Sequence, residues 1–225
     1  MIPRVLEPEV MDDAEEAREY NEMDHSEVNQ VFVTDLLWEV AQCGLDETLR
    51  VLDVGTGTAL IPIELCLQAT ESHQIIAIDL AEEMLKLARK NVEEAGLENQ
   101  VELKLVDAKG LPEELGLFDL VMSNSIVHHI PEPGPVLGEM YRALKPGGFL
   151  FVRDLLRPAH EKELEQLVEL YAGEESPRAR QLFTDSLRAA LTLKELDALC
   201  HEAGIDRFTL KATSDRHWTL SALKT

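Results

Sequence analysis

The segment VLDVGTGTA, residues 51–59, decides the fold of this 225-residue chain. A short aliphatic run contains Asp53, and two glycines then alternate with small residues before a helix-compatible segment, residues 59–69. Gly55 and Gly57 allow positive backbone φ angles and let a ligand approach the main chain without a Cβ in the way. The pattern therefore predicts a strand that turns sharply into a helix beside a bound ligand.

A second strand is expected at residues 74–79, and it ends in Asp79. Asp79 follows the glycine turn by about 20 residues, where such folds place the acid that binds the two hydroxyls of a ribose. We therefore expect the chain to bind a cofactor that contains a nucleoside.

Strand-like and helix-like segments alternate from residue 49 onward. The alternation is typical of a parallel sheet with helices on both faces, a doubly wound Rossmann-like α/β fold. Strands are expected at about 49–54, 74–79, 100–106, 118–123 and 147–153, and helices at about 59–70, 81–95, 134–144 and 159–172.

The N-terminal part precedes this alternation. Residues 12–43 predict one or two helices, the second beginning at Asp24 or Ser26, with Asp24 and Glu27 as a loose capping box. We expect residues 1–45 to form a helical cap or lid on the α/β domain, residues 46–225.

The C-terminal part predicts further helix over residues 176–203, followed by two strands at 208–213 and 217–223. The connection between these strands is short enough for a hairpin, so the last strand is expected to run antiparallel to its neighbour.

The composition is strongly acidic, with 43 Asp and Glu against 21 Lys and Arg and a net charge of −22. Such a surface repels nucleic acids and anionic membranes, which disfavours nucleic acid as a partner. No window approaches the about 18 apolar residues of a membrane span, and no secretory signal is visible. No apolar stripe predicts an oligomeric state.

The three cysteines are widely spaced and odd in number. Cys43, Cys66 and Cys200 are expected to be buried free thiols in a cytoplasmic protein, with no disulfide and no metal site.

Five motifs follow one another in the order of a known family. They are Asp53-Val-Gly55-Thr-Gly57, Asp79, Val106-Asp107-Ala108, the segment 118–124 (FDLVMSN), and the turn 144–148 (LKPGG). Over roughly residues 30–225 the chain resembles the class I S-adenosylmethionine-dependent methyltransferases, and within them the small-molecule branch typified by the ubiquinone and menaquinone biosynthesis enzymes. The resemblance implies a seven-stranded sheet with six parallel strands and one reversed, and S-adenosyl-L-methionine as cofactor.

The glycine turn separates this family from dinucleotide enzymes, whose G-x-G-x-x-G turn seats a pyrophosphate at a helix N-terminus. Here Ala59 follows Gly57 by two positions, and residue 60 is not glycine. The departure disfavours a nicotinamide oxidoreductase. Within the methyltransferases, Ala59 stands where glycine is frequent.

The resemblance also implies roles for individual residues. Asp53, Gly55 and Gly57 would contact the methionine part of the cofactor, and Asp79 the ribose. Each acid also has a plainer interpretation as a strand-end or capping residue. The remaining expected cofactor contacts are Leu80 and Met84 beside the adenine, Asp107 and Ala108 at its ring edge, and Thr56, Asn124, Ser125 and Tyr20.

The loop after the fourth strand carries His128 and His129. Methyl transfer is an in-line displacement that needs an unprotonated nucleophile close to the methyl carbon. A histidine titrates near neutrality and is suited to remove a proton from the acceptor. Adjacent side chains point in different directions, so we expect one of the two, preferably His129, to reach the substrate. Alternatively, both bind the backbone at a helix start.

Substrate contacts are less well defined. Tyr20 and His25 either belong to a lid that closes over the site or pack an amphipathic helix. Arg153 either binds a substrate carboxylate or pairs with Asp154. The loop after the fourth strand lacks the Asn/Asp-Pro-Pro-Tyr/Phe signature of nucleic-acid amino methyltransferases.

The leading hypothesis is an enzyme that methylates a small-molecule acceptor. The alternatives are a non-catalytic module that binds S-adenosylmethionine or S-adenosylhomocysteine, and a protein methyltransferase whose acidic surface attracts basic peptides.

Overall fold

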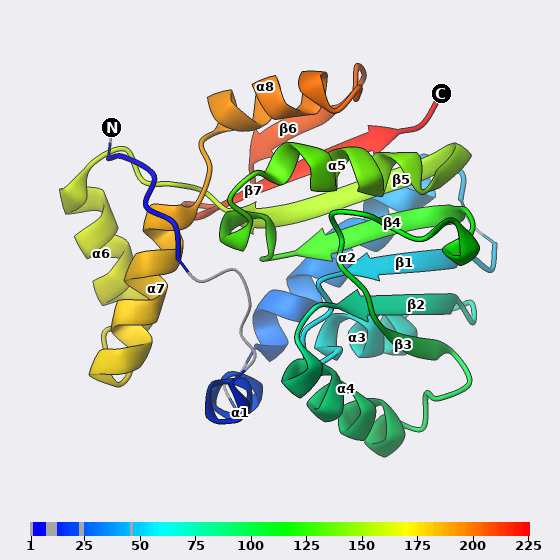
Figure 1. The fold of residues 1–225 in the computed structure, drawn as a ribbon, viewed down its shortest axis with the longest axis horizontal. Helices are drawn as coiled ribbons and strands as arrows, with labels where there is room; N and C mark the ends of the chain where they lie inside the picture. The colour runs from blue at the N-terminus through cyan, green and yellow to red at the C-terminus, as the bar shows by residue number, and fades with distance from the viewer. Residues whose placement is uncertain (1, 8–12, 23–24, 46) are drawn as a thin grey trace.

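A seven-stranded sheet forms the centre of the molecule in the computed structural model, which describes residues 2–7, 13–22, 25–45 and 47–225 (Figure 1). Its strand order is β3-β2-β1-β4-β5-β7-β6. Strands β1 to β5 run parallel, and β7 runs antiparallel to both β5 and β6. Six strands therefore share one direction and one is reversed, which confirms the expected sheet. The strands are β1 (Arg50–Val54), β2 (Gln74–Asp79), β3 (Val101–Leu105), β4 (Phe118–Asn124), β5 (Leu144–Leu155), β6 (Thr209–Ala212) and β7 (His217–Leu223).

Helices cover both faces of the sheet. On one face, Phe32 and Leu36 of α2, Leu65 of α3 and Leu85 of α4 share a core with the sheet. On the other face, α5 and α8 pack over a core that includes the fully buried Trp218. The helices are α1 (Ala14–Glu22), α2 (Ser26–Gln42), α3 (Leu60–Gln68), α4 (Glu82–Ala95), α5 (Pro133–Arg142), α6 (Glu161–Ala172), α7 (Pro177–Ala189) and α8 (Leu193–Glu202).

The strands alternate their side chains between these two cores. Along β1, Val51 belongs to the core under α2 and α3. Leu52 and Val54, which point to the opposite face, belong to the other core. This period of two is the normal pleat of a strand that is buried on both faces.

Two boundaries differ from the sequence-based expectation. Strand β5 begins at Leu144, which pairs with Phe118, so the glycine turn lies within an irregular strand rather than before it. The expected helix 176–203 is broken, because Leu191 forms a bridge with Leu156 and Thr192 begins α8 with a capping box to Glu195.

The second N-terminal helix begins at Ser26, one of the two expected starts. Its N-cap is His25, which forms no side-chain cap bond, and Asp24 of the expected capping box lies outside the described residues.

The carboxyl ends of the parallel strands face α6, α7, α1 and residues 2–7 (Figure 1). Helix α1 packs on α4, where Ala17 meets Ala81 and Met84. Among the residues that the structure describes, no helix is long and apolar enough to cross a membrane. Cys43, Cys66 and Cys200 are free thiols; Cys200 is buried, whereas Cys43 and Cys66 are only partly buried, which differs from the expectation of three buried thiols.

Candidate active site

The glycine turn between β1 and α3 has the predicted left-handed conformation. Gly55 and Gly57 have φ angles of +72° and +55°, and the amides of Gly55 and Thr56 both donate to the carbonyl of Ile78 at 2.9 Å. Ala59 also has a positive φ, +63°, as the N-cap of α3. Glycine takes this conformation without strain, which explains why glycine is favourable at this position.

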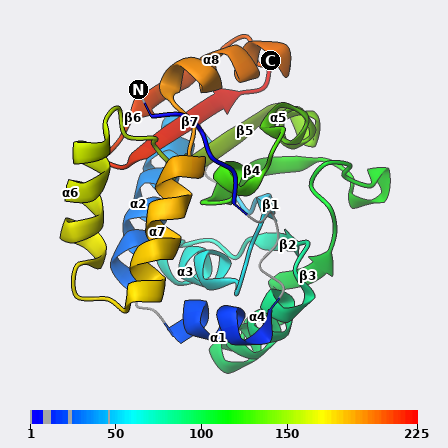
Figure 2. The same ribbon diagram turned by 60° about the vertical axis from the view of Figure 1, so that its left-hand side comes forward.

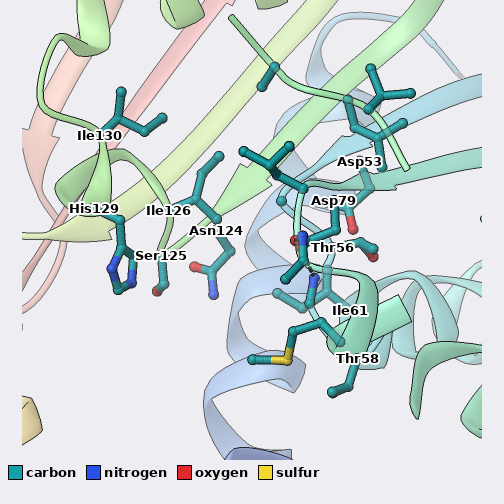
Figure 3. A pocket seen from close by; sticks show the side chains of 18 of the residues that line it. Asp53, Thr56, Thr58, Ile61, Asp79, Asn124, Ser125, Ile126, His129 and Ile130 are labelled. Atoms are coloured by element: carbon teal, nitrogen blue, oxygen red, sulfur yellow. Dashed lines mark hydrogen bonds between the residues drawn. The ribbon is translucent and has the colours of Figure 1, made fainter. Parts of the chain in front are cut away.

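A cavity opens at the carboxyl ends of β1, β2 and β4, with the glycine turn on its wall. Figure 3 shows Asn124, Ser125 and His129 on one side of it, with Asp53, Thr56 and Asp79 across from them. The structure thus brings together all the expected cofactor contacts except Tyr20, whose side chain is not described. The lining includes Asp53, Gly55, Thr56, Gly57, Asp79, Leu80, Met84, Asp107, Ala108, Asn124 and Ser125.

Other lining residues were not expected from the sequence. Asn29 of α2 lies one turn after His25 and lines the cavity, whereas His25 does not. Of these residues, Thr58 could have been predicted from the sequence, because it directly follows the glycine turn. The additional residues include Asn29, Thr58, Leu60, Ile61, Lys109, Ile126 and Ile130.

Three buried polar atoms near the glycine turn have no hydrogen-bond partner among the described residues. They are Oδ2 of Asp53 and the hydroxyls of Thr56 and Thr58. Buried polar groups are almost always hydrogen-bonded, so this set is suited to a polar ligand group such as the ammonium and carboxylate of an amino acid. Burial raises the pKa of Asp53 to about 7; the adjacent hydroxyl of Thr56 opposes this shift, and the nearby carboxylate of Asp79 adds to it. A cationic ligand group would reverse this effect.

Asp79 supports the turn from the end of β2. Its Oδ2 accepts from the amide of Gly57 at 2.7 Å, and its Oδ1 accepts from the amide of Ala81 at 2.8 Å. A carboxylate can accept up to about four hydrogen bonds. Accepting from these two amides is therefore compatible with Asp79 also binding ribose hydroxyls.

The end of the cavity where the resemblance places the adenine is mainly apolar. Met84 is buried and Leu80 is exposed, and Ala108 lines the same region. Asp107 is exposed, and its Oδ1 accepts from the amide of Lys109 at 2.9 Å. Asp107 therefore closes a local turn while it lines the cavity.

The two histidines have different surroundings. His129 lines the cavity, whereas His128 is buried and its Nδ1 donates to Oδ1 of Asp154 at 2.5 Å. Burial lowers the pKa of His128, but the carboxylate of Asp154 outweighs this effect, so the net pKa is raised. Burial likewise raises the pKa of Asp154, but His128 outweighs it and the net pKa is lowered. His128 and Asp154 therefore form a buried ion pair.

A third group, Glu7, joins the histidines. Its Oε1 lies 3.1 Å from Nδ1 of His129 and 3.4 Å from Nε2 of His128. The three ligand atoms lie within 4.8 Å of one another, so a divalent cation could also bind them. Glu7 could not be identified from the sequence, because nothing in an acidic N-terminal segment distinguishes the one acid that contacts the loop after the fourth strand.

Arg153 does not form the expected pair with Asp154. Its guanidinium donates to Oδ2 of Asp35 at 2.7 Å and to the hydroxyl of Thr219 at 2.9 Å. Arg153 and Asp154 are adjacent on β5 and point to opposite faces of the sheet, which prevents the pairing. Arg153 is also absent from the lining of the cavity, so the geometry gives no support to its binding a substrate carboxylate.

Comparison with known proteins agrees with this geometry. A family model described as a methyltransferase domain matches residues 45–204. The ubiquinone biosynthesis O-methyltransferase of Xanthomonas oryzae pv. oryzae is 30% identical over 188 residues, which cover 78% of this chain and 76% of that protein.

Solved structures share the fold. A SAM-dependent methyltransferase from Aquifex aeolicus has a TM-score of 0.68 at 21% identity and covers 95% of this chain and 99% of its own. The plantazolicin methyltransferase BpumL, solved with SAH, has a TM-score of 0.73 at 15% identity and covers 93% and 89%. This chain belongs to the methyltransferase domain family, and its sequence and fold define a class I S-adenosylmethionine-dependent methyltransferase.

Proposed function

We propose that this enzyme transfers the methyl group of S-adenosyl-L-methionine to a small-molecule acceptor and releases S-adenosyl-L-homocysteine. The observation that carries the proposal is one cavity with the glycine turn and Asp79 on one side and His129 on the other. When bound, the cofactor supplies an electrophilic methyl group on a sulfonium.

The chain's own residues bind and orient the cofactor. Oδ2 of Asp53 and the hydroxyls of Thr56 and Thr58 form hydrogen bonds with its amino-acid part. Asp79 accepts hydrogen bonds from the ribose hydroxyls, and Met84 and Leu80 contact the adenine. Helix α1 covers this end through Ala17, and we assign α1, within the expected cap of residues 1–45, to a lid on that basis.

The acceptor side is formed by Asn124, Ser125 and His129. His129 is the candidate base, and its ring lies 4.1 Å, centroid to centroid, from the ring of His128, which is paired with Asp154. The nearby segment 2–7 covers this side, which favours a small molecule over a peptide or a nucleic acid duplex. The O-methyltransferase names of the relatives agree with an acceptor of this size.

The acidic net charge of −22 opposes nucleic acid substrates. The three free thiols favour a reducing compartment, and we place the enzyme in the cytoplasm.

The test is isothermal titration of S-adenosylmethionine and S-adenosylhomocysteine, followed by methyl transfer to a panel of phenols, catechols, thiols and amines. We expect binding of both ligands that Asp79→Ala abolishes, and turnover with at least one acceptor class. Binding without turnover on any acceptor would favour the non-catalytic module, and turnover on basic peptides alone would favour a protein methyltransferase. Binding of a nicotinamide cofactor instead would overturn the assignment.

A further inference from the structure

Residues 2–7, which we call the N-terminal strap, cross the acceptor side of the site beside α7 (Figure 2). Ile2 is buried among residues of β5, α6 and α7. The amide of Val5 donates to the carbonyl of Arg188 at 3.1 Å. The guanidinium of Arg4 donates to four carbonyls, those of Ala189, Pro131, His128 and Ile130, at 2.7 to 3.1 Å. The strap therefore joins α7 to the histidine loop.

The strap ends at Glu7, whose side chain is only 9% exposed. Its Oε2 accepts from the hydroxyl of Ser186 on α7 at 3.2 Å. Its Oε1 has no regular hydrogen bond within the described chain and faces the ring nitrogens of His128 and His129. Such contacts are often long or poorly aligned in a ligand-free enzyme and tighten when the substrate binds.

The groups around Glu7 act on its ionisation in opposite directions. Burial raises the pKa of Glu7 and the carboxylates of Asp185 and Asp154 add to this, whereas His128 and the hydroxyl of Ser186 oppose it, and the net pKa is raised. His128 bridges the carboxylates of Asp154 and Glu7 through its two ring nitrogens. Arg4, on the strap itself, is the other nearby cation. Among the groups that act on Glu7, His128 is the one that most favours its carboxylate form.

A charged Glu7 determines which nitrogen of His129 carries the proton. The nitrogen that faces Oε1 is Nδ1, at 3.1 Å, so a carboxylate there favours the tautomer with the proton on Nδ1 and the lone pair of the neutral ring on Nε2. An acid that fixes a histidine's tautomer in this way supports general-base catalysis in the Ser-His-Asp triad.

We propose that Glu7 is a positioning residue that fixes His129 as the base, and that the N-terminal strap delivers it to the acceptor site. The inference rests on the proposed methyl transfer. It also implies an acceptor that carries a dissociable proton, such as a hydroxyl or a thiol. The acceptor loses this proton to Nε2 of His129 as its lone pair bonds the methyl carbon, and the electron pair of the broken C–S bond remains on sulfur.

The first test measures the tautomer of His129 by ¹⁵N chemical shifts of the histidine rings, without acceptor. In the wild type we expect a protonated Nδ1 and an unprotonated Nε2. Glu7→Gln should shift the ring toward the other tautomer and lower kcat about 100-fold, the order of a general-base contribution, with KM within about threefold. Glu7→Asp, which keeps the charge, should retain the tautomer and recover part of kcat.

Two further variants distinguish the effect of a neighbouring charge from the effect of the position of the strap. Asp185→Asn removes a neighbouring carboxylate and should leave both the tautomer and kcat unchanged. Arg4→Met keeps the carboxylate of Glu7 but loosens the strap that holds it against His129, so it should reproduce the tautomer change of Glu7→Gln together with faster proteolysis near the N-terminus. An unchanged tautomer in Arg4→Met would overturn the role of the strap.

The role of Glu7 is overturned if Glu7→Gln leaves the tautomer and kcat unchanged. It is also overturned if a chelator abolishes activity and a divalent cation restores it, since Glu7 and the histidines then act as metal ligands. Failure of the proposed function differs from both outcomes, because the wild type itself would then bind no S-adenosylmethionine.

Discussion

The carboxylate of Asp79 at the end of β2 accepts a 2.7 Å hydrogen bond from the amide of Gly57 in the turn after β1. One acid thus supports the loop that surrounds the methionine end of the cavity while lining the cavity itself. This bond and the one from the amide of Ala81 match the interpretation of Asp79 as a strand-end residue, and the proposed contact with the ribose would add a second role to the same side chain. Substitutions at this position therefore affect the turn and the ligand together.

Asp79→Asn and Asp79→Ala separate the two roles. The asparagine keeps one acceptor oxygen for the Gly57 amide but loses the charge that strengthens bonds to ribose hydroxyls. We expect it to weaken S-adenosylmethionine binding about 10-fold to 100-fold, the equivalent of one charge-assisted bond of about 1.5–3 kcal/mol. The alanine should also lower the thermal midpoint of the ligand-free protein. Calorimetric titration and thermal unfolding measure both effects, and full affinity in Asp79→Asn would contradict the ribose assignment.

Binding of the cofactor should depend on the ionisation of Asp53. Because burial raises the pKa of Asp53 to about 7, the carboxyl is largely protonated below that pH in the ligand-free protein. An ammonium group of the ligand favours the ionised form, so binding releases a proton. The affinity should fall about tenfold for each pH unit from 7 down to 5.

Asp53→Asn is the matched control, since it should bind more weakly and without this pH dependence. The stability of the ligand-free protein has the opposite pH dependence. A raised pKa stabilises the fold at low pH, and this contribution is lost as the pH rises through about 7. Titrations in two buffers of different ionisation enthalpy measure the released proton, and an affinity that is flat from pH 5 to 7 would show that Asp53 does not meet the ammonium.

The parts of the structure that could be predicted from sequence are those with local signals. Strands β1 and β2 and the glycine turn are of this kind. They are predicted by the aliphatic segments, by the run before Gly55 and by the acid at Asp79, because each of these elements depends only on residues nearby in the chain. The break between α7 and α8 was missed, since it depends on Leu191 reaching Leu156 across the fold. Glu7 was missed for the same reason.

The partners of Arg153 show a second limit. The sequence offers Asp154 as the nearest acid, but strand geometry turns adjacent residues to opposite faces. The true partner, Asp35, lies on α2, and its proximity becomes visible only when α2 is packed on β5. Long-range polar pairs of this kind carry no local pattern.

Gly55 is expected to be intolerant of any side chain. A Cβ there would lie 2.2 Å from Cγ2 of Ile126, and its φ is +72°. Gly55→Ala should lose about 1–3 kcal/mol of stability from overpacking, in addition to backbone strain, and should weaken cofactor binding.

Gly57→Ala provides the comparison, because its φ is +55° but nothing lies within 4 Å of its Cβ. It should cost only the strain, about 1–2 kcal/mol. Ile126→Ala should partly rescue Gly55→Ala and not Gly57→Ala. Urea unfolding of the four variants measures these differences, and equal losses in the two alanine variants would exclude the clash with Ile126.

Arg153 is expected to stabilise the fold rather than to bind substrate. Its guanidinium joins β5 to Asp35 of α2 and lies 5.7 Å from the ring centroid of Phe32 and 5.6 Å from that of Phe151. Arg153→Met keeps most of the apolar stem and removes these contacts, which should lower the free energy of unfolding by about 1–3 kcal/mol. Asp35→Asn should cost less, because the side chain of Asp35 is 49% exposed and water replaces part of its bond. Unfolding in urea and steady-state kinetics distinguish the roles: the KM for the acceptor should change less than about twofold in Arg153→Met. A tenfold rise in KM with unchanged stability would instead assign Arg153 to a substrate carboxylate.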